Sequence, residues 1–277
     1  MGRVETRMYR RRQRRAKWRR WLVAVAVAAG ICLLLQQGNR ASMIAEYIGL
    51  PEKTMNKTAF DTTPGSREVT LPAETWYAIQ TGIFSTQEAA LQKADAYTQR
   101  GAPGTVIRQG EKWRVFIACY GSEAEAAAVR TRLENNQKVD TYLYVWACPE
   151  IRLRLSGMAG QLDAAEAGFT LLKSAAAVLR DTAVEIDAAQ LTIQEAKDAA
   201  KALGEQIVQW EDTARACFGR EIPPLIEEML KITAGWKARY KVLAAAEDAT
   251  ALSAAYKAQA MGLYDEICTW RQTLAAQ

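Results

Sequence analysis

Apolar and polar residues alternate in a pattern that occurs twice in the first half of the chain. The first copy is an alternating segment at 76–84 that gives way to helical spacing, and the second is a similar segment at 112–120 followed by another helical stretch. A period of two indicates a β-strand, whereas a period near 3.6 indicates an amphipathic helix. Two more alternating segments lie at 104–109 and 141–146. The order predicts a βαββαβ unit of the ferredoxin-like type, with both helices on one face of a four-stranded sheet.

Alternation also assigns each strand residue to a face, because neighbouring residues point to opposite sides of a sheet. The residues predicted to pack beneath the two helices are Ile79, Val115, Ile117, Leu143 and Val145. The residues predicted on the opposite, open face are Gln80, Arg114, Phe116, Tyr142, Tyr144 and Trp146. Large rings on an uncovered sheet usually mark a binding surface. The alternative is that the C-terminal helices cover this face and its aromatic residues are core.

Two short motifs resemble a known family. The motif YAIQTGIFS at 77–85 and the motif WRVFIACYGS at 113–122 are similar to the two halves of a SPOR domain. The chain departs from the family where Ala118 and Cys119 stand in place of the usual Gly-Pro. The resemblance covers residues 75–148, about a quarter of the chain.

The resemblance implies a non-catalytic bacterial envelope protein that binds peptidoglycan. The ligand it implies is a glycan strand stripped of its stem peptides, which collects at the division septum. The open face suits this ligand, because sugar rings offer C–H faces to aromatic rings, while Gln80 and Arg114 can hydrogen-bond hydroxyls and N-acetyl carbonyls.

The N-terminus combines a basic tail with an apolar run. Residues 1–20 contain ten Lys and Arg and one Glu, so this tail has a formal charge of +9. Because the whole chain has a formal charge of +5, residues 21–277 have a net charge of −4. We predict a transmembrane helix at 21–38, with the tail in the cytoplasm by the positive-inside rule and the rest of the chain extracytoplasmic. Residues 39–74 contain three prolines and show no sustained periodicity, which is typical of a linker.

Two alternatives apply to this N-terminus. A cleaved signal peptide is the first, but no small-x-small site follows Leu35 closely, so we expect an uncleaved single-pass anchor. Nucleic-acid binding by the basic tail is the second. Because the tail lies next to the predicted membrane span, it is better explained as a topology determinant that contacts anionic lipid. We therefore expect no nucleic acid as a partner.

The C-terminal half, 157–277, is rich in alanine and predicts helices. Apolar and small residues recur at steps of three and four from Leu172 to Cys217, which is a heptad seam. Gly219 is a stop signal, and Pro223-Pro224 opens the next helix. We expect no strand after Pro149, and an α-helical hairpin or three-helix bundle whose seam is core. The alternative is that the seam forms a partner-binding groove or a homodimer surface.

The chain lacks the residues of several chemistries. It contains no histidine, which excludes Ser-His-Asp and Cys-His catalysis and His-based zinc sites. We find no phosphate-binding or dinucleotide motif, so we expect no cofactor, no metal and no enzymatic activity. A Cys119–Cys148 disulfide would join strands about 10 Å apart, beyond the reach of about 7 Å between Cα atoms, so we expect buried free thiols.

The sequence therefore predicts an α+β chain with an N-terminal transmembrane helix, a SPOR-like domain and a helical domain. The first functional hypothesis is septal peptidoglycan binding, with the helices recruiting a division or sporulation protein. An anchor followed by this domain is also similar in layout to the stage II sporulation protein B family. The second hypothesis is a membrane-anchored interaction protein whose helices cover the sheet, with no glycan bound. RNA binding by the aromatic face is a weaker third, because the predicted external location and mild acidity oppose it.

Overall fold

A computed structural model describes residues 61–276, all of which fall within one compact unit. The predicted cytoplasmic tail at 1–20, the transmembrane helix at 21–38 and most of the linker lie outside the described residues. Within residues 61–276, none of the helices combines the length and the apolar character needed to cross a membrane.

The predicted βαββαβ unit is confirmed. Its sheet has the order β3-β4-β2-β5 with every neighbouring pair antiparallel, as in a ferredoxin-like fold. A short π-helical turn extends the second helix. In chain order the elements are β2 (Glu74–Phe84), α2 (Gln87–Thr98), β3 (Thr105–Gln109), β4 (Lys112–Tyr120), α3 (Glu123–Arg132), η2 (Leu133–Gln137) and β5 (Tyr142–Cys148).

Side-chain caps start both helices of this unit. The hydroxyl of Thr86 accepts from the backbone N–H of Ala89, and the hydroxyl of Ser122 accepts from that of Glu125. Each bond satisfies one of the donors that the first turn of a helix leaves unpaired. The caps therefore fix the points at which strand geometry gives way to helix in both copies of the pattern.

The face beneath α2 and α3 is the core of this unit. Ile79, Val115 and Ile117 pack there against alanines of both helices, as predicted, and Leu143 packs at its edge. The prediction was wrong for Val145, which is 56% exposed. β5 is an edge strand of the sheet, and Val145 is not part of the cluster that packs beneath α2 and α3.

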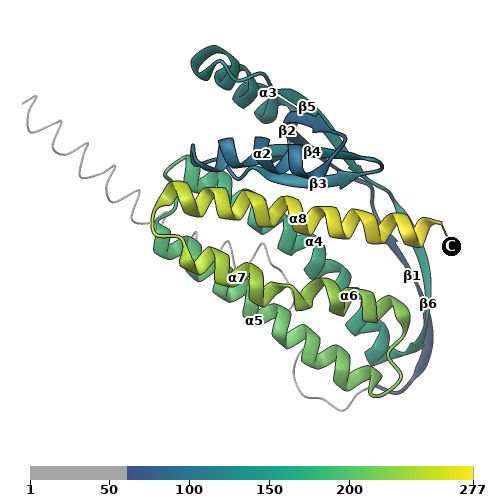
Figure 1. Cartoon of the computed structure of the whole chain (residues 1–277). Helices are drawn as coiled ribbons and strands as arrows, with labels where there is room; N and C mark the ends of the chain where they lie inside the picture. Colours follow the sequence, from purple (N-terminus) through teal and green to yellow (C-terminus); the bar gives the residue numbers. More distant parts are fainter. Residues whose placement is uncertain (1–60, 277) are drawn as a thin grey trace, which may run out of the picture. The chain divides into compact units, whose positions relative to one another are not determined.

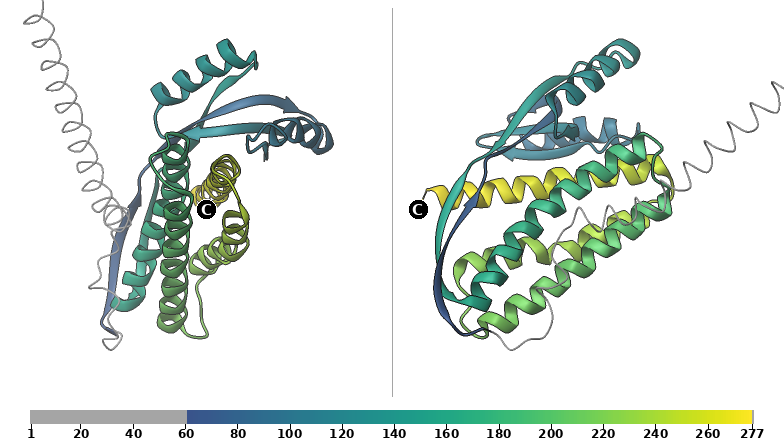
Figure 2. Two further views of the ribbon diagram at one scale, coloured as in Figure 1. Left: turned by 90° about the vertical axis from the view of Figure 1, so that its left-hand side faces the viewer. Right: turned by 180° about the vertical axis from the view of Figure 1, so that it is seen from behind.

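A two-stranded ribbon, which the sequence analysis missed, joins the two ends of this unit to the helical half. Residues assigned to the linker form β1 (Pro64–Leu71), and it pairs antiparallel with β6 (Ile151–Met158). The ribbon packs along α4 (Figure 2). The expectation that no strand follows Pro149 was therefore wrong, although Leu153 and Leu155 alternate with arginines in the sequence.

The C-terminal half is helical, as predicted, and contains five helices within the described residues. The longest two, α4 and α8, pack against one another, and α5 packs on the other side of α4 (Figure 1). The helices are α4 (Ala159–Asp187), α5 (Ile193–Phe218), α6 (Pro224–Ala234), α7 (Trp236–Ala245) and α8 (Ala249–Ala275).

The predicted heptad seam is interrupted once, between α4 and α5. Ala189 has a φ of 53°, in the left-handed region, and Thr192 then caps α5 in a reciprocal capping box with Glu195. The stop at Gly219 and the start at Pro224 are confirmed. The seam therefore belongs to two antiparallel helices whose small and apolar residues face each other as core.

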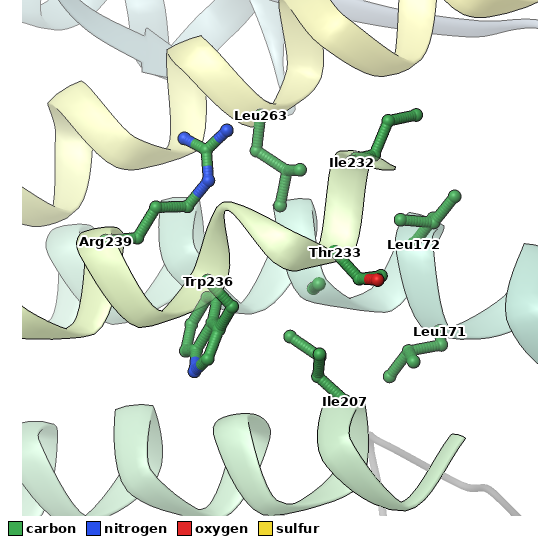
Figure 3. Close-up of a pocket in the computed structure, with 9 residues that line it drawn as sticks. Leu171, Leu172, Ile207, Ile232, Thr233, Trp236, Arg239 and Leu263 are labelled. Atoms are coloured by element: carbon green, nitrogen blue, oxygen red, sulfur yellow. The ribbon is translucent and has the colours of Figure 1, made fainter. Parts of the chain in front are cut away.

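The interior of the helical half contains a small hollow, which apolar side chains line (Figure 3). Its two polar residues both bond within the protein. Thr233 donates to a carboxylate oxygen of Glu211 at 2.6 Å, and Arg239 donates to Glu266 of α8 at 2.6 Å. The hollow is therefore a packing feature between helices, where Arg239 ties α7 to α8.

Candidate functional site

The six residues predicted on the open face do lie on one face of the sheet, opposite α2 and α3. The pairing register places Gln80 opposite Tyr142 and also opposite Phe116, and it aligns Trp146 with Trp76 on the first strand. Alternation along each strand therefore assigned this face correctly.

One half of this face is covered by the C-terminal helices. We call it the covered half: it lies where β2 begins and β5 ends, and its aromatic residues are Trp76, Phe116 and Trp146. Tyr264 of α8 stacks on Trp76 with ring centroids 3.9 Å apart and an interplanar angle of 3°. Its hydroxyl donates to the backbone oxygens of Glu74 at 3.1 Å and Trp146 at 3.2 Å. Figure 1 shows α8 beside the sheet, and the three rings of the covered half are buried.

Two of the predicted binding residues lie in the covered half, and the prediction that they are open to solvent was wrong. Phe116 is 0% exposed and Trp146 is 3% exposed. The physical reason is the cluster that they form with α8, since Trp146 stacks on Phe116 at 5.3 Å and meets Tyr264 edge-on at 5.4 Å. Their present role is to hold the helix on the sheet.

A cation completes the covered half. The guanidinium of Arg180, from α4, lies 4.7 Å from the Trp76 ring centre and is paired with Asp181 at 2.7 Å. Burial lowers the pKa of Arg180, but its hydrogen bond with Asp181 and the charge of that carboxylate raise the pKa by more. Arg180 therefore keeps its charge over the ring, where the attraction to the π face is strengthened by partial desolvation.

The other half of the face, which we call the free half, lies where β2 ends and β5 begins. It contains Gln80, Arg114, Tyr142 and Tyr144, together with Ile83, which is 50% exposed. Tyr142 is 63% exposed, while Arg114 and Tyr144 are half-buried. The free half is therefore the part of the predicted face that a ligand can reach in this structure.

A fixed polar pair lies at the centre of the free half. Arg114 donates through Nη1 to the side-chain oxygen of Gln80 at 2.7 Å, and its guanidinium lies 4.8 Å from the Tyr144 ring centre. Gln80 itself is only 4% exposed, so the expectation that it is open to a ligand was wrong. It orients Arg114, whose Nε is a buried donor without a partner among the described residues. An unpaired buried donor costs free energy in the folded state.

Sequence reasoning missed three residues that decide the shape of this face. The position of Trp76 could have been predicted from the sequence, because alternation along the strand places it on the same face as Gln80. The position of Ile83 could not be predicted by alternation. The pairing register shifts between Ile79 and Gly82, and a β-bulge there moves the following residues by one position. No local pattern predicts the contact of Tyr264 with the sheet, because its partner strand is more than 100 residues away in the chain.

Comparison with known proteins agrees with the fold and the motifs. Residues 73–144 match the family described as the SPOR domain, and this part of the chain is a SPOR domain. The match ends at Tyr144, so α4 and α8, which cover half of the face, lie outside the matched residues.

Two curated relatives match the same region. Both are named endolytic peptidoglycan transglycosylase RlpA, one from Salmonella typhi and one from Salmonella typhimurium, and each is 31% identical over 68 residues. The aligned segment is 24% of this chain and 18% of each relative. The chain thus spans less than a fifth of the relatives' length, and the activity in their name is theirs. A comparison with solved structures found no match.

Proposed function

We propose that this chain binds the glycan strands of peptidoglycan through the free half of its SPOR domain. The observation that carries the proposal is the uncovered group of Tyr142, Arg114 and Tyr144 on the sheet face opposite the domain's own helices. A tyrosine ring provides a flat apolar surface for a sugar ring, and the guanidinium provides donors for hydroxyl and carbonyl oxygens. The match to the SPOR domain and the peptidoglycan enzymes among the relatives support the same ligand class.

The proposed ligand is the strand stripped of stem peptides, and the proposed role is binding without catalysis. A strand without peptides exposes both faces of its sugars, which suits a shallow, half-covered sheet. The absence of histidine from the sequence and the lack of a paired-carboxylate signal also favour a binding role.

Anchoring and septal localisation are further parts of the proposal. The basic residues 1–20, followed by the apolar run 21–35 within the predicted span 21–38, support a single-pass anchor with its tail in the cytoplasm. The helical half would then place a division or sporulation protein near the glycan, in a layout similar to that of the stage II sporulation protein B family.

A second candidate function is an interaction module in which the sheet binds no glycan. The specific observation in its favour is the covered half, where α8 takes the surface that the aromatic residues would otherwise offer. Under this alternative, Tyr142 and Arg114 contact a protein partner or none.

Co-sedimentation with purified sacculi tests the first proposal. The full chain, kept in mild detergent, is mixed with sacculi before and after amidase treatment, and we expect binding to rise when stem peptides are removed. Tyr142→Ala is expected to weaken binding about tenfold, because it removes roughly 1 to 1.5 kcal/mol of ring contact.

The matched control is Val145→Ala, three residues along the same strand and also exposed, but on the opposite face. It should bind like the unchanged chain. Equal binding of both variants, or binding that is indifferent to amidase treatment, would favour the interaction module.

A further inference from the structure

The end of β5 and the second half of α8 bring two thiols together. Cys148 is the last residue of β5 and is 1% exposed, and Cys268 on α8 is 2% exposed. Arg271, three residues beyond Cys268 on α8, donates a hydrogen bond to the sulfur of Cys148 at 3.4 Å, so the two thiols lie close to each other. The other described cysteines have different surroundings, since Cys119 lies near Arg180 and Cys217 lies near Asp163. All four are free in this structure.

Contacts on both sides of Cys268 hold this part of α8 against the end of β5. Tyr264, Cys268 and Arg271 follow one another at steps of four and three, so they share one face of α8. Tyr264 bonds to the backbone of Glu74 and Trp146, as described above. One turn beyond Cys268, Arg271 donates to the backbone oxygen of Pro72 at 3.1 Å and contacts the Cys148 sulfur at 3.4 Å.

The surroundings of the pair make its two thiols chemically unequal. The hydrogen bond from Cys268 and the adjacent Arg271 guanidinium lower the pKa of Cys148, against the opposing effect of burial. The same contact, with burial, raises the pKa of Cys268. Because the thiolate is the nucleophile in disulfide exchange, we assign the first attack to Cys148.

We propose that Cys148 and Cys268 are a redox pair that closes into a disulfide between the sheet and α8. The oxidant is a small-molecule or protein disulfide. The Cys148 thiolate attacks one of its sulfurs, forms a mixed disulfide and releases the first thiolate. Cys268 then loses its proton and attacks the Cys148 sulfur, which forms the internal disulfide and releases the second thiolate. The oxidant is reduced to two thiols, and the protein loses two protons and two electrons.

The bond would join segments that are far apart in the chain and would keep the covered half closed. It would enclose β6, α4 to α7 and α8 as far as Cys268 in one loop, and it would tie α8 covalently to the end of β5 beside Trp146. Closing a loop of this length limits the unfolded chain strongly. This inference is independent of glycan binding, since it concerns only how the helix is held on the sheet.

The test uses the full chain, refolded in a buffer of reduced and oxidised glutathione so that thiols are accessible before α8 docks. Free thiols are then blocked with N-ethylmaleimide, and protease fragments are identified by mass spectrometry. We expect a cross-linked pair of peptides containing Cys148 and Cys268, which disappears after treatment with dithiothreitol. We expect the oxidised chain to melt about 5 to 10 °C above the reduced chain.

Cysteine variants provide the controls. Cys119→Ser and Cys217→Ser should keep both the cross-link and the rise in melting temperature, whereas Cys268→Ser should lose both. Maleimide on Cys148 and Cys268 at every glutathione ratio, or Cys148 cross-linked to a different cysteine, would overturn the pairing. A cross-link without a rise in melting temperature would overturn the claim that it fixes α8. The peptides of the unchanged chain decide the pairing even if Cys268→Ser fails to fold.

Discussion

Two aromatic residues on one face of β5 differ sharply in their exposure to solvent. Tyr142 and Trp146 are both aromatic and lie on the same side of β5, yet one is 63% exposed and the other 3%. Tyr264 accounts for the difference, because it reaches only the end of the strand that holds Trp146. Tyr142 is therefore available to a ligand, whereas replacing Trp146 would open a cavity in the core.

Asp265, beside Tyr264 on α8, gives a pH-dependence prediction. Burial, with a smaller effect of the Glu266 charge, raises the pKa of Asp265 to about 6 from an ordinary value of 3.8. Between these two values the folded chain holds a proton that the unfolded chain has lost, so stability falls as the pH rises from about 4 to about 6. Above that window the penalty stays constant, at about 2 kcal/mol after allowance for solvent screening.

Asp265→Asn should remove this part of the pH dependence and make the chain more stable than the unchanged protein at pH 7. Urea unfolding at pH 4, 5, 6 and 7 measures the effect. Asp198→Asn is the control for the loss of one carboxylate charge, because Asp198 is exposed on α5. If the profiles of the Asp265 variant and the unchanged chain coincide, burial of this carboxyl does not affect stability in the way proposed.

At the scale of elements, close approach of helices gives a second prediction, from two glycines in helix interiors. A Cβ on Gly168 of α4 would lie 2.3 Å from Met229 and 2.5 Å from the Trp210 ring, so this glycine lets α5 and α6 pack closely against α4. A Cβ on Gly262 of α8 would meet only the end of the Arg239 side chain, at 3.4 Å.

Gly168→Ala should therefore lower the free energy of unfolding by about 1 to 3 kcal/mol through overpacking. Gly262→Ala should be neutral or raise it by up to about 1 kcal/mol, because alanine restricts the unfolded chain and favours helix. Urea denaturation of both variants provides the comparison. Similar effects at the two positions would mean that the close packing at Gly168 is not rigid.

At the scale of the whole described unit, α8 makes the SPOR domain depend on the helical half. In an isolated fragment of residues 72–150, the rings of Trp76, Phe116 and Trp146 would all be exposed, and exposed aromatic clusters of this kind promote association. We expect that fragment to aggregate or to bind a hydrophobic dye, and a fragment of residues 61–277 to stay monomeric. Analytical ultracentrifugation measures both. A monomeric, cooperatively melting 72–150 fragment would show that the covering helix is dispensable.

Local patterns were sufficient for the fold of the SPOR domain and for the limits of several helices. The order of strands and helices, the two faces of the sheet, the stop at Gly219 and the start at Pro224 all follow from periodicity and from residues with special backbone preferences. One strand of the β1–β6 ribbon could have been predicted, because Leu153 and Leu155 of β6 alternate with arginines. Its pairing was not, since β1 lies in a segment whose prolines suggested a linker.

Local alternation fixes which residues share a face of the sheet, whereas long-range packing fixes which end of that face is open. Alternation is imposed by the backbone of each strand, so it can be read over a few residues. The burial of Phe116 and Trp146, the pairing of Cys148 with Cys268 and the exposure of Tyr142 depend on where α8 crosses the sheet. That position results from contacts between segments more than 100 residues apart, such as Tyr264 with Trp146, which no local pattern encodes.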